Sequence, residues 1–353
     1  MPQLLTQTPT GSVAFHADAT ALPSPGSGEV LVRLLAAPIH QLDLLVLANA
    51  YPVKPTFHHT DNAPIPGYDG VALVEACGPG DTRGLRPGDT VVPAAFGIGT
   101  WRTHALLPAT ALLKLATRPH DLATAALLRL AVAPAYCLVE DMVPLKPGDW
   151  VIQNAGASAI AQLVGQFAHR KGARVLSVVR DRDEAAVAAM RDRLLQRRGG
   201  VDAVLTESEL ESEGVGQGRR VVLALDAVHG ASGRRLVEAL AAGGAYVQLG
   251  LLGGGREPLP LDARDLFARR LTMKGFRGSA QLAARSEDEQ RALFGWFVEL
   301  FNAGELVAPP LGLERVEWTV ADVEGTEKRV VGAVAKAQGG RLGQRKQILV
   351  FKH

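Results

Sequence analysis

Apolar strand-like segments that alternate with helical segments constrain the fold of this chain more than any other feature of its sequence. We predict from this alternation an α/β fold, because such strands favour a parallel sheet covered by helices on both faces. The doubly wound domain is expected over residues 121–299. Its six predicted strands are residues 150–154, 174–179, 201–205, 221–226, 246–250 and 271–276.

Helix signals flank several of these strands. Asp121 is a suitable N-cap for a mostly apolar helical stretch that reaches Val143, and Pro134 predicts a kink or a break within it. Further helices are expected from about residue 158 to 171, from Asp183 onward, and near residues 287–303.

The first 120 residues follow a different pattern. Short β-type runs at 29–35, 71–76 and 89–94 are bounded by Gly and Pro, as antiparallel strands tend to be. After residue 300 the chain returns to a strand, a helix and a final strand near 347–351. We therefore predict a β-rich domain, residues 1–120 and 300–353, that is interrupted by the doubly wound domain.

Composition excludes several classes of protein. The 353 residues carry a net charge of +2 with no long block of like charge, which argues against a dedicated nucleic-acid binder. Two cysteines, Cys77 and Cys137, form neither a disulfide framework nor a four-cysteine zinc site, so reduced thiols are expected. No apolar run is long enough for a membrane span. The first Lys or Arg is Arg33, so we expect no secretory or Arg-rich leader in this chain.

The connection after the first predicted parallel strand has the composition of a phosphate-binding turn. Dinucleotide folds place a tight, glycine-rich turn there, so that backbone N–H groups at a helix N-terminus meet the pyrophosphate. Of the three usual glycines only Gly156 is present, and Ser158 and Ala161 occupy the other two positions. An ordinary turn of small residues is the alternative, but the six-strand alternation favours a dinucleotide.

Charged residues at the end of the second parallel strand indicate which dinucleotide is bound. An acid at this place commonly holds the ribose 2′-hydroxyl of NAD, whereas an arginine accommodates the 2′-phosphate of NADP. Here Arg180 and Arg182 flank Asp181. Because guanidinium matches phosphate with paired hydrogen bonds, we predict NADPH, with a solvated charged loop as the alternative.

A metal site is not expected from the sequence. The segment His58-His59-Thr60-Asp61 is the richest in possible ligands. Adjacent side chains of an extended chain point in opposite directions, so neighbouring histidines rarely bind one ion together. We therefore predict no metal.

The whole chain resembles the medium-chain dehydrogenase/reductases, in their zinc-free branch. More narrowly, it resembles the mitochondrial-type trans-2-enoyl thioester reductases of fatty-acid synthesis. Zinc-using members of the superfamily carry Gly-His-Glu where this chain has Gly67-Tyr68-Asp69. The resemblance implies a GroES-like catalytic domain around a Rossmann domain. The matching segments are residues 37–39, 97–103, 151–155, 178–182 and 346–349.

The resemblance also implies the residues of the site. The family's catalytic tyrosine falls on Tyr51, which follows Ala37-Pro38-Ile39 and Asp43 at the family's spacing. Trp101 is predicted to wall the substrate pocket, with a core indole as the alternative. The predicted cofactor contacts are Gly156, Ala157, Ser158, Ala159, Ile160, Arg180, Asp181, Arg182, Leu249, Gly250, Leu251, Leu252, Phe276, Arg277, Gly278 and Lys346.

Three functions remain open at this stage. The first is reduction of enoyl thioesters of coenzyme A or acyl carrier protein by NADPH, and the second is quinone reduction by NADPH. The third is a nucleotide-binding homologue without turnover, which Ala131 and Arg277 favour because they replace a family asparagine and tryptophan. By family analogy we expect a homodimer joined at the strand over 271–276. The compartment implied is the mitochondrial matrix in a eukaryote and the cytoplasm in a bacterium.

Overall fold

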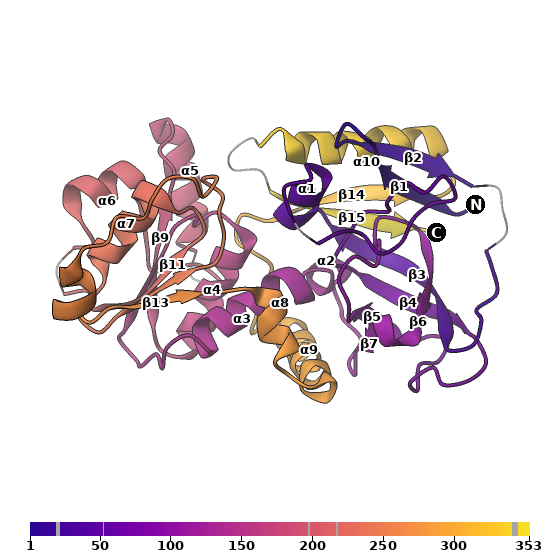
Figure 1. Cartoon of the computed structure of the whole chain (residues 1–353), viewed down its shortest axis with the longest axis horizontal. Helices are drawn as coiled ribbons and strands as arrows, with labels where there is room; N and C mark the ends of the chain where they lie inside the picture. Colours follow the sequence, from indigo (N-terminus) through magenta and orange to yellow (C-terminus); the bar gives the residue numbers. More distant parts are fainter. Residues whose placement is uncertain (19–21, 52, 197, 217, 341–344) are drawn as a thin grey trace. The chain divides into compact units, whose positions relative to one another are not determined.

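The computed structural model describes residues 1–353 except 19–21, 52, 197, 217 and 341–344, and it contains two compact units (Figure 1). The β-rich unit comprises residues 1–130, 286–305 and 312–353. The parallel-sheet unit comprises residues 131–285 and 306–311.

The parallel-sheet unit is built on one six-stranded sheet, in the order β10-β9-β8-β11-β12-β13, and every pair of neighbours is parallel. The predicted doubly wound α/β sheet is therefore confirmed. β13 lies at one end of the strand order, where the prediction placed the edge strand. The strands are β8 (Trp150–Gln153), β9 (Arg174–Val179), β10 (Ala203–Thr206), β11 (Val221–Asp226), β12 (Ala245–Gln248) and β13 (Thr272–Gly275).

Helices cover both faces of this sheet (Figure 1). Leu210 of α6 and Leu236 of α7 share one buried cluster with the sheet residues Ile152 and Tyr246. Helix α4 packs against β9 and against α3. The helices are α3 (Ala133–Glu140), α4 (Ala159–Arg170), α5 (Glu184–Leu194), α6 (Glu207–Glu213), α7 (Gly230–Ala239) and α8 (Gly278–Ala283).

The β-rich unit contains a seven-stranded sheet in the order β14-β15-β3-β4-β5-β7, with β6 also paired to β3. A separate hairpin joins β1 to β2. Trp101 and Trp318 lie at the centre of its buried core. The strands are β1 (Gln3–Gln7), β2 (Val13–Ala17), β3 (Glu29–Pro38), β4 (Val71–Cys77), β5 (Thr90–Pro93), β6 (His104–Pro108), β7 (Leu112–Lys114), β14 (Leu313–Thr319) and β15 (Lys346–Lys352).

The helices of the β-rich unit are α1 (Gln41–Leu47), α2 (Leu122–Ala125), α9 (Glu287–Asn302) and α10 (Val323–Gln338). The predicted N-cap Asp121 is confirmed, because its side chain accepts a hydrogen bond from the N–H of Ala123. The helical stretch after it is not one regular α-helix. A π-helical segment, Leu128–Val132, leads directly into α3, which begins at Ala133 with Pro134 as its second residue. The predicted break at Pro134 therefore lies at a change of helix type, where the missing N–H of proline removes one backbone hydrogen bond.

The chain divides differently from the predicted boundaries at residues 120 and 299. Helix α9 belongs to the β-rich unit, where it packs against β7. Asn302 accepts a hydrogen bond from the N–H of His120 and donates one to the carbonyl of Arg118. These contacts are long-range, so helical periodicity alone did not reveal them.

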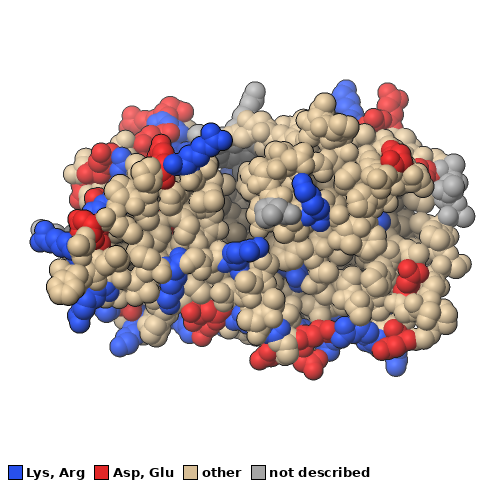
Figure 2. All heavy atoms as spheres, viewed as in Figure 1, with Lys and Arg blue, Asp and Glu red and all other residues tan. Residues whose placement is uncertain are grey.

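Basic and acidic side chains are interspersed on the face shown in Figure 2. Within the described residues, no helix combines the length and the apolar character needed to cross a membrane.

Candidate functional site

The order of the parallel strands creates a topological switch point at the carboxyl ends of β8 and β11. The chain leaves β8 toward β9 on one side, whereas β11 lies beside β8 on the other and leads toward β12. Open α/β sheets bind ligands at such a switch point, outside the carboxyl ends of the strands. The predicted segments 156–160, 180–182, 249–252 and 276–278 follow β8, β9, β12 and β13. The fold therefore brings all four segments to the side of the sheet where the carboxyl ends of its strands lie.

The turn after β8 leaves no room for a side chain at its glycine. A Cβ on Gly156 would lie 2.7 Å from Cβ of Ser177, and the Gly156 N–H donates to the carbonyl of Val178 at 2.9 Å. Ser158 is the N-cap of α4 and accepts a hydrogen bond from the N–H of Ala161 at 3.2 Å. Because this oxygen acts as an acceptor, the hydroxyl proton of Ser158 remains able to donate to an anion.

Buried hydrogen bonds join the ends of β8 and β11 beside this turn. Asn154 donates to Asp226 at 2.6 Å and to Ser232 at 3.0 Å, and it accepts from the N–H of Ala227 at 2.7 Å. Asp226 also accepts from the hydroxyl of Tyr246 at 2.5 Å. Burial, followed by this hydrogen bond, raises the pKa of Tyr246, so the phenol stays protonated. This network fixes the backbone at the ends of β8 and β11.

A cavity of about 240 Å³ opens at this edge of the sheet, and Arg180 lines it. The guanidinium of Arg180 has no hydrogen-bond or ion-pair partner among the described residues. Most of the remaining lining comes from α7 and from the segments after β11 and β12. The lining residues other than Arg180 are Glu207, Val228, His229, Gly230, Ala231, Ser232, Arg235, Gly253, Gly255 and Glu257.

The two neighbours of Arg180 are not among the lining residues. Asp181 accepts a hydrogen bond from the N–H of Ser208 at 3.3 Å, at the start of α6. Nε of Arg182 is buried and has no hydrogen-bond partner among the described residues. Its pKa is lowered by burial and by the like charge of Arg180. Of the three predicted residues, Arg180 therefore has the placement that suits a phosphate in this cavity.

The remaining predicted cofactor segments stand at the ends of β12 and β13. The N–H of Leu249 donates to the carbonyl of Asp226, and the side chain of Leu251 is 60% exposed. Phe276 is buried, whereas Arg277 is exposed and stands at the N-cap position of α8, which begins at Gly278. Their contact with a cofactor stays a prediction.

Tyr51 lies in the β-rich unit, just after α1, and is half-buried. Its hydroxyl forms no hydrogen bond with any residue that the structure describes. The buried Tyr68 supports the following segment, since its hydroxyl donates to the carbonyl of Val53 at 3.3 Å. The hydroxyl of Tyr51, the predicted catalytic residue, can therefore donate a hydrogen bond to a ligand.

Three buried polar residues, His40, Asp43 and Asp69, form a cluster in the same unit. Asp43 accepts from the N–H of His40 at 2.7 Å and completes the cap of α1, but its Oδ1 has no partner among the described residues. Asp69 lies 3.3 Å from Nε2 of His40 and accepts from the N–H of Leu130 at 2.8 Å. His40 and Asp43 stand together at the start of α1, whereas Asp69 comes from a different part of the chain.

Burial shifts every titratable group of this cluster toward its neutral form. It raises the pKa of Asp43 to about 7 and that of Asp69 to about 8. The pKa of His40 is lowered, first by burial and then by the charge of Lys346. Burial lowers the pKa of Lys346 itself to about 8, and its ammonium donates to the carbonyl of Ile39 at 2.9 Å. The structure thus places Lys346, predicted to be near the cofactor, beside this cluster.

Comparison with known proteins identifies the family. Residues 26–117 match the alcohol dehydrogenase GroES-like domain. The human mitochondrial enoyl-[acyl-carrier-protein] reductase is 36% identical over 290 residues, which cover 80% of this chain and 73% of the human protein. The chain belongs to the enoyl thioester reductase family. An NADPH quinone oxidoreductase of Kluyveromyces marxianus is 30% identical, over 84% of this chain and 80% of its own.

Comparison with solved structures also finds an enoyl thioester reductase. The structure of Etr1p, the Candida tropicalis enoyl thioester reductase, with NADP and crotonyl-CoA superposes with a TM-score of 0.82. The alignment covers 99% of both chains at 23% sequence identity. The GroES-like domain that the resemblance implied is therefore confirmed, as is the two-domain fold of this reductase.

Trp101 of this enoyl thioester reductase does not line the predicted pocket. Its side chain is fully buried in the core of the β-rich unit, and its indole N–H donates to the carbonyl of Pro38 at 3.1 Å. An indole that is packed on all sides and has a backbone partner is a core residue, as the alternative reading of the sequence held.

Sequence reasoning missed other residues of the reductase. His229, Ser232 and Arg235 line the cavity beside Arg180 but match no motif. A usable signal was their position just after the fourth parallel strand, because carboxyl ends of parallel strands share one edge.

Proposed function

We propose that the protein reduces the 2,3 double bond of trans-2-enoyl thioesters with NADPH, the acyl group being carried by coenzyme A or acyl carrier protein. The observation that carries the proposal is the guanidinium of Arg180, which has no partner among the described residues and lines a cavity at the switch point of the sheet, in a chain of this family. A free guanidinium at this place suits the 2′-phosphate that distinguishes NADPH from NADH.

The residues of the parallel-sheet unit fit the parts of NADPH. The turn at 156–158 opens α4, so backbone N–H groups and the Ser158 hydroxyl suit the pyrophosphate. Arg180 would bind the 2′-phosphate, and the cavity beside it is large enough for part of a nucleotide. When bound, NADPH supplies the hydride that adds to the β-carbon of the substrate.

Tyr51 is the residue that we assign to the developing negative charge on the thioester oxygen. Its hydroxyl has no partner among the described residues, so it can donate to that oxygen without losing another hydrogen bond. A phenol donates without bringing a counter-charge. Loss of one such donor typically costs about 2.7–4 kcal/mol of transition-state stabilisation.

The test follows NADPH oxidation with crotonyl-CoA, with a longer trans-2-enoyl-CoA and with 1,2-naphthoquinone. We expect turnover of both thioesters and a fall in kcat of about 10²–10³-fold for Tyr51→Phe. Tyr136→Phe in α3 is the control and should turn over like the parent. Turnover of the quinone alone, at the same rate in Tyr51→Phe, would overturn the assignment.

Quinone reduction is the second candidate, and the relative from Kluyveromyces marxianus is the observation in its favour. It needs the same coenzyme but no specific hydrogen bond to a thioester oxygen. Saturable NADPH binding with no turnover of any acceptor would instead favour a homologue that has lost activity.

We infer a homodimer that forms by pairing of β13 strands, since β13 ends the strand order and three of its four residues are exposed. Gel filtration tests the dimer. For the compartment we infer the mitochondrial matrix if the source is a eukaryote, because similar enoyl-[acyl-carrier-protein] reductases are named mitochondrial, and the cytoplasm if it is a bacterium. Fractionation of the source cells tests this inference.

A further inference from the structure

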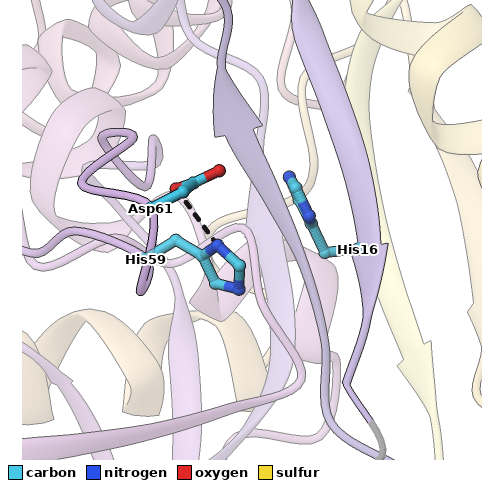
Figure 3. Close-up of side chains that lie close together, drawn as sticks. All are labelled: His16, His59 and Asp61. Atoms are coloured by element: carbon cyan, nitrogen blue, oxygen red, sulfur yellow. Dashed lines mark hydrogen bonds and ion pairs between the residues drawn. The ribbon is translucent and has the colours of Figure 1, made fainter.

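Side chains from two distant segments of the β-rich unit converge away from the residues assigned above. His16 comes from β2, and His59 and Asp61 come from the loop that precedes β4 (Figure 3). Each offers one ligand atom, and these atoms lie within 4.8 Å of one another. In the described part of the chain, no other three His, Cys, Asp or Glu side chains meet in this way.

The arrangement explains why a metal site was not expected here from the sequence. His58 and His59 diverge, as the prediction for adjacent histidines held. His58 is exposed and forms a β-bridge with Pro64. His59 faces β2 instead, and its ring centroid lies 4.6 Å from that of His16. The second imidazole is supplied by a strand near the N-terminus rather than by the neighbouring residue.

A buried hydroxyl fixes the ring of His16. Nε2 of His16 lies 2.8 Å from Oγ1 of Thr6, which is buried on β1. When Nε2 carries the proton and donates to this oxygen, Nδ1 keeps its lone pair for a ligand. Hydrogen bonds of this kind orient metal-binding imidazoles.

Carboxylates face both nitrogens of His59. Nδ1 lies 3.1 Å from Oδ1 of Asp61, and Nε2 lies 3.3 Å from Oδ2 of Asp18. One nitrogen can therefore bind a cation while the other donates to its carboxylate, as metal-bound histidines commonly do. The N–H of Ala63 donates to Oδ1 of Asp61 at 2.9 Å and so holds this carboxylate in place beside His59.

We propose that His16, His59 and Asp61, with Asp18 nearby, form a binding site for a divalent transition-metal ion such as Zn²⁺. Two imidazoles with carboxylate oxygens are donors that suit zinc and its neighbours, whereas Ca²⁺ and Mg²⁺ prefer oxygen ligands alone. The bound ion would tie the β1–β2 hairpin to the loop after Tyr51. Its role is structural, because none of the four side chains belongs to the residues assigned to coenzyme or thioester.

The test measures metal binding directly. Tag-free protein is stripped with a chelator, exchanged into chelator-free buffer and titrated calorimetrically with ZnCl₂. We expect one equivalent of zinc to bind the parent, and His16→Gln and His59→Gln to bind it at least tenfold more weakly. His58→Gln is the matched control, since it removes an exposed histidine of the same loop, and it should bind like the parent.

Two further measurements test whether a loss of zinc binding reflects misfolding and whether zinc binds to a cysteine instead. The metal-free Tm of each variant shows whether it folds, and Asp61→Asn provides a milder change if His59→Gln does not. A Co²⁺ spectrum shows whether a cysteine thiolate binds instead. No saturable zinc binding by the parent, equal loss in His58→Gln, or a thiolate spectrum would overturn the proposal. None of these measurements uses turnover, so their failure is distinct from failure of the proposed reduction.

Discussion

The two polar regions of this reductase are built in different ways. In the parallel-sheet unit, the turn at 156–158 and Arg180 follow consecutive strands, so their positions result from local β–α geometry. In the β-rich unit, His40, Asp69 and Lys346 meet only because distant segments fold together. The position of a site made by chain connectivity is set by its own turns, whereas the position of a site made by packing depends on each neighbouring segment.

The largest expected effect tests this dependence on packing at Gly67, which precedes Tyr68 and Asp69. A Cβ there would lie 2.4 Å from Oγ1 of Thr100, and the φ of Gly67 is +104°. Overpacking and a left-handed backbone together predict that Gly67→Ala lowers the free energy of unfolding by about 2–5 kcal/mol. Urea unfolding measures the loss.

Gly148→Ala is the matched control from the parallel-sheet unit. Gly148 also has a positive φ, +86°, but nothing lies within 4 Å of a Cβ there. Only the backbone cost of about 1–2 kcal/mol should remain. Equal losses in the two variants would contradict the packing argument.

The second prediction concerns the pH dependence that burial gives to the cluster. The pKa of Asp69 is raised from 3.8 to about 8, so the folded protein binds this proton more tightly than the unfolded chain does. The stability that this group contributes is present below pH 4 and is lost as the pH rises through 8. Relative to Asp69→Asn, the parent should therefore lose a few kcal/mol between pH 4 and 8, at about 1.4 kcal/mol per pKa unit.

Urea unfolding of both proteins at several pH values measures this slope. Asp61→Asn, studied with a chelator present, is the control, because the pKa of Asp61 is lowered and its contribution should stay constant between pH 5 and 8. A parallel course for the parent and Asp69→Asn would show that Asp69 is ionised in the folded protein.

These differences also account for how much of the molecule was predictable. The six parallel strands and the N-cap Asp121 were predicted because apolar runs and capping residues act over a few residues. The membership of α9 in the β-rich unit depends on Asn302 bonding to the segment at 118–120. Burial of Trp101 and the contact of His16 with His59 likewise depend on which distant segments pack together. The hydrophobic periodicity of a sequence does not predict such long-range contacts.

The third prediction addresses the coenzyme at Arg180. Charge-assisted hydrogen bonds to phosphate contribute about 1.5–3 kcal/mol. Arg180→Ala should therefore weaken NADPH binding about 10–100-fold while NADH binding changes little, as fluorescence titration would measure. Arg174→Ala, at the opposite end of β9, is the control and should leave both affinities unchanged. An equal loss for the two coenzymes would refute the assignment of the 2′-phosphate.

The smallest expected effect compares two serine N-caps, one in each unit. Ser158 accepts from the N–H of Ala161 at 3.2 Å, and Ser286 accepts from the N–H of Glu289 at 3.3 Å. Replacement of either by Ala should cost about 1 kcal/mol of stability, because each leaves helical N–H groups without a partner. Only Ser158→Ala should also weaken NADPH binding, by about two- to tenfold, since only its hydroxyl is assigned to the pyrophosphate in the proposed function. If Ser286→Ala lowers the affinity equally, the loss reflects general destabilisation, and the turn after β8 binds phosphate through its backbone alone.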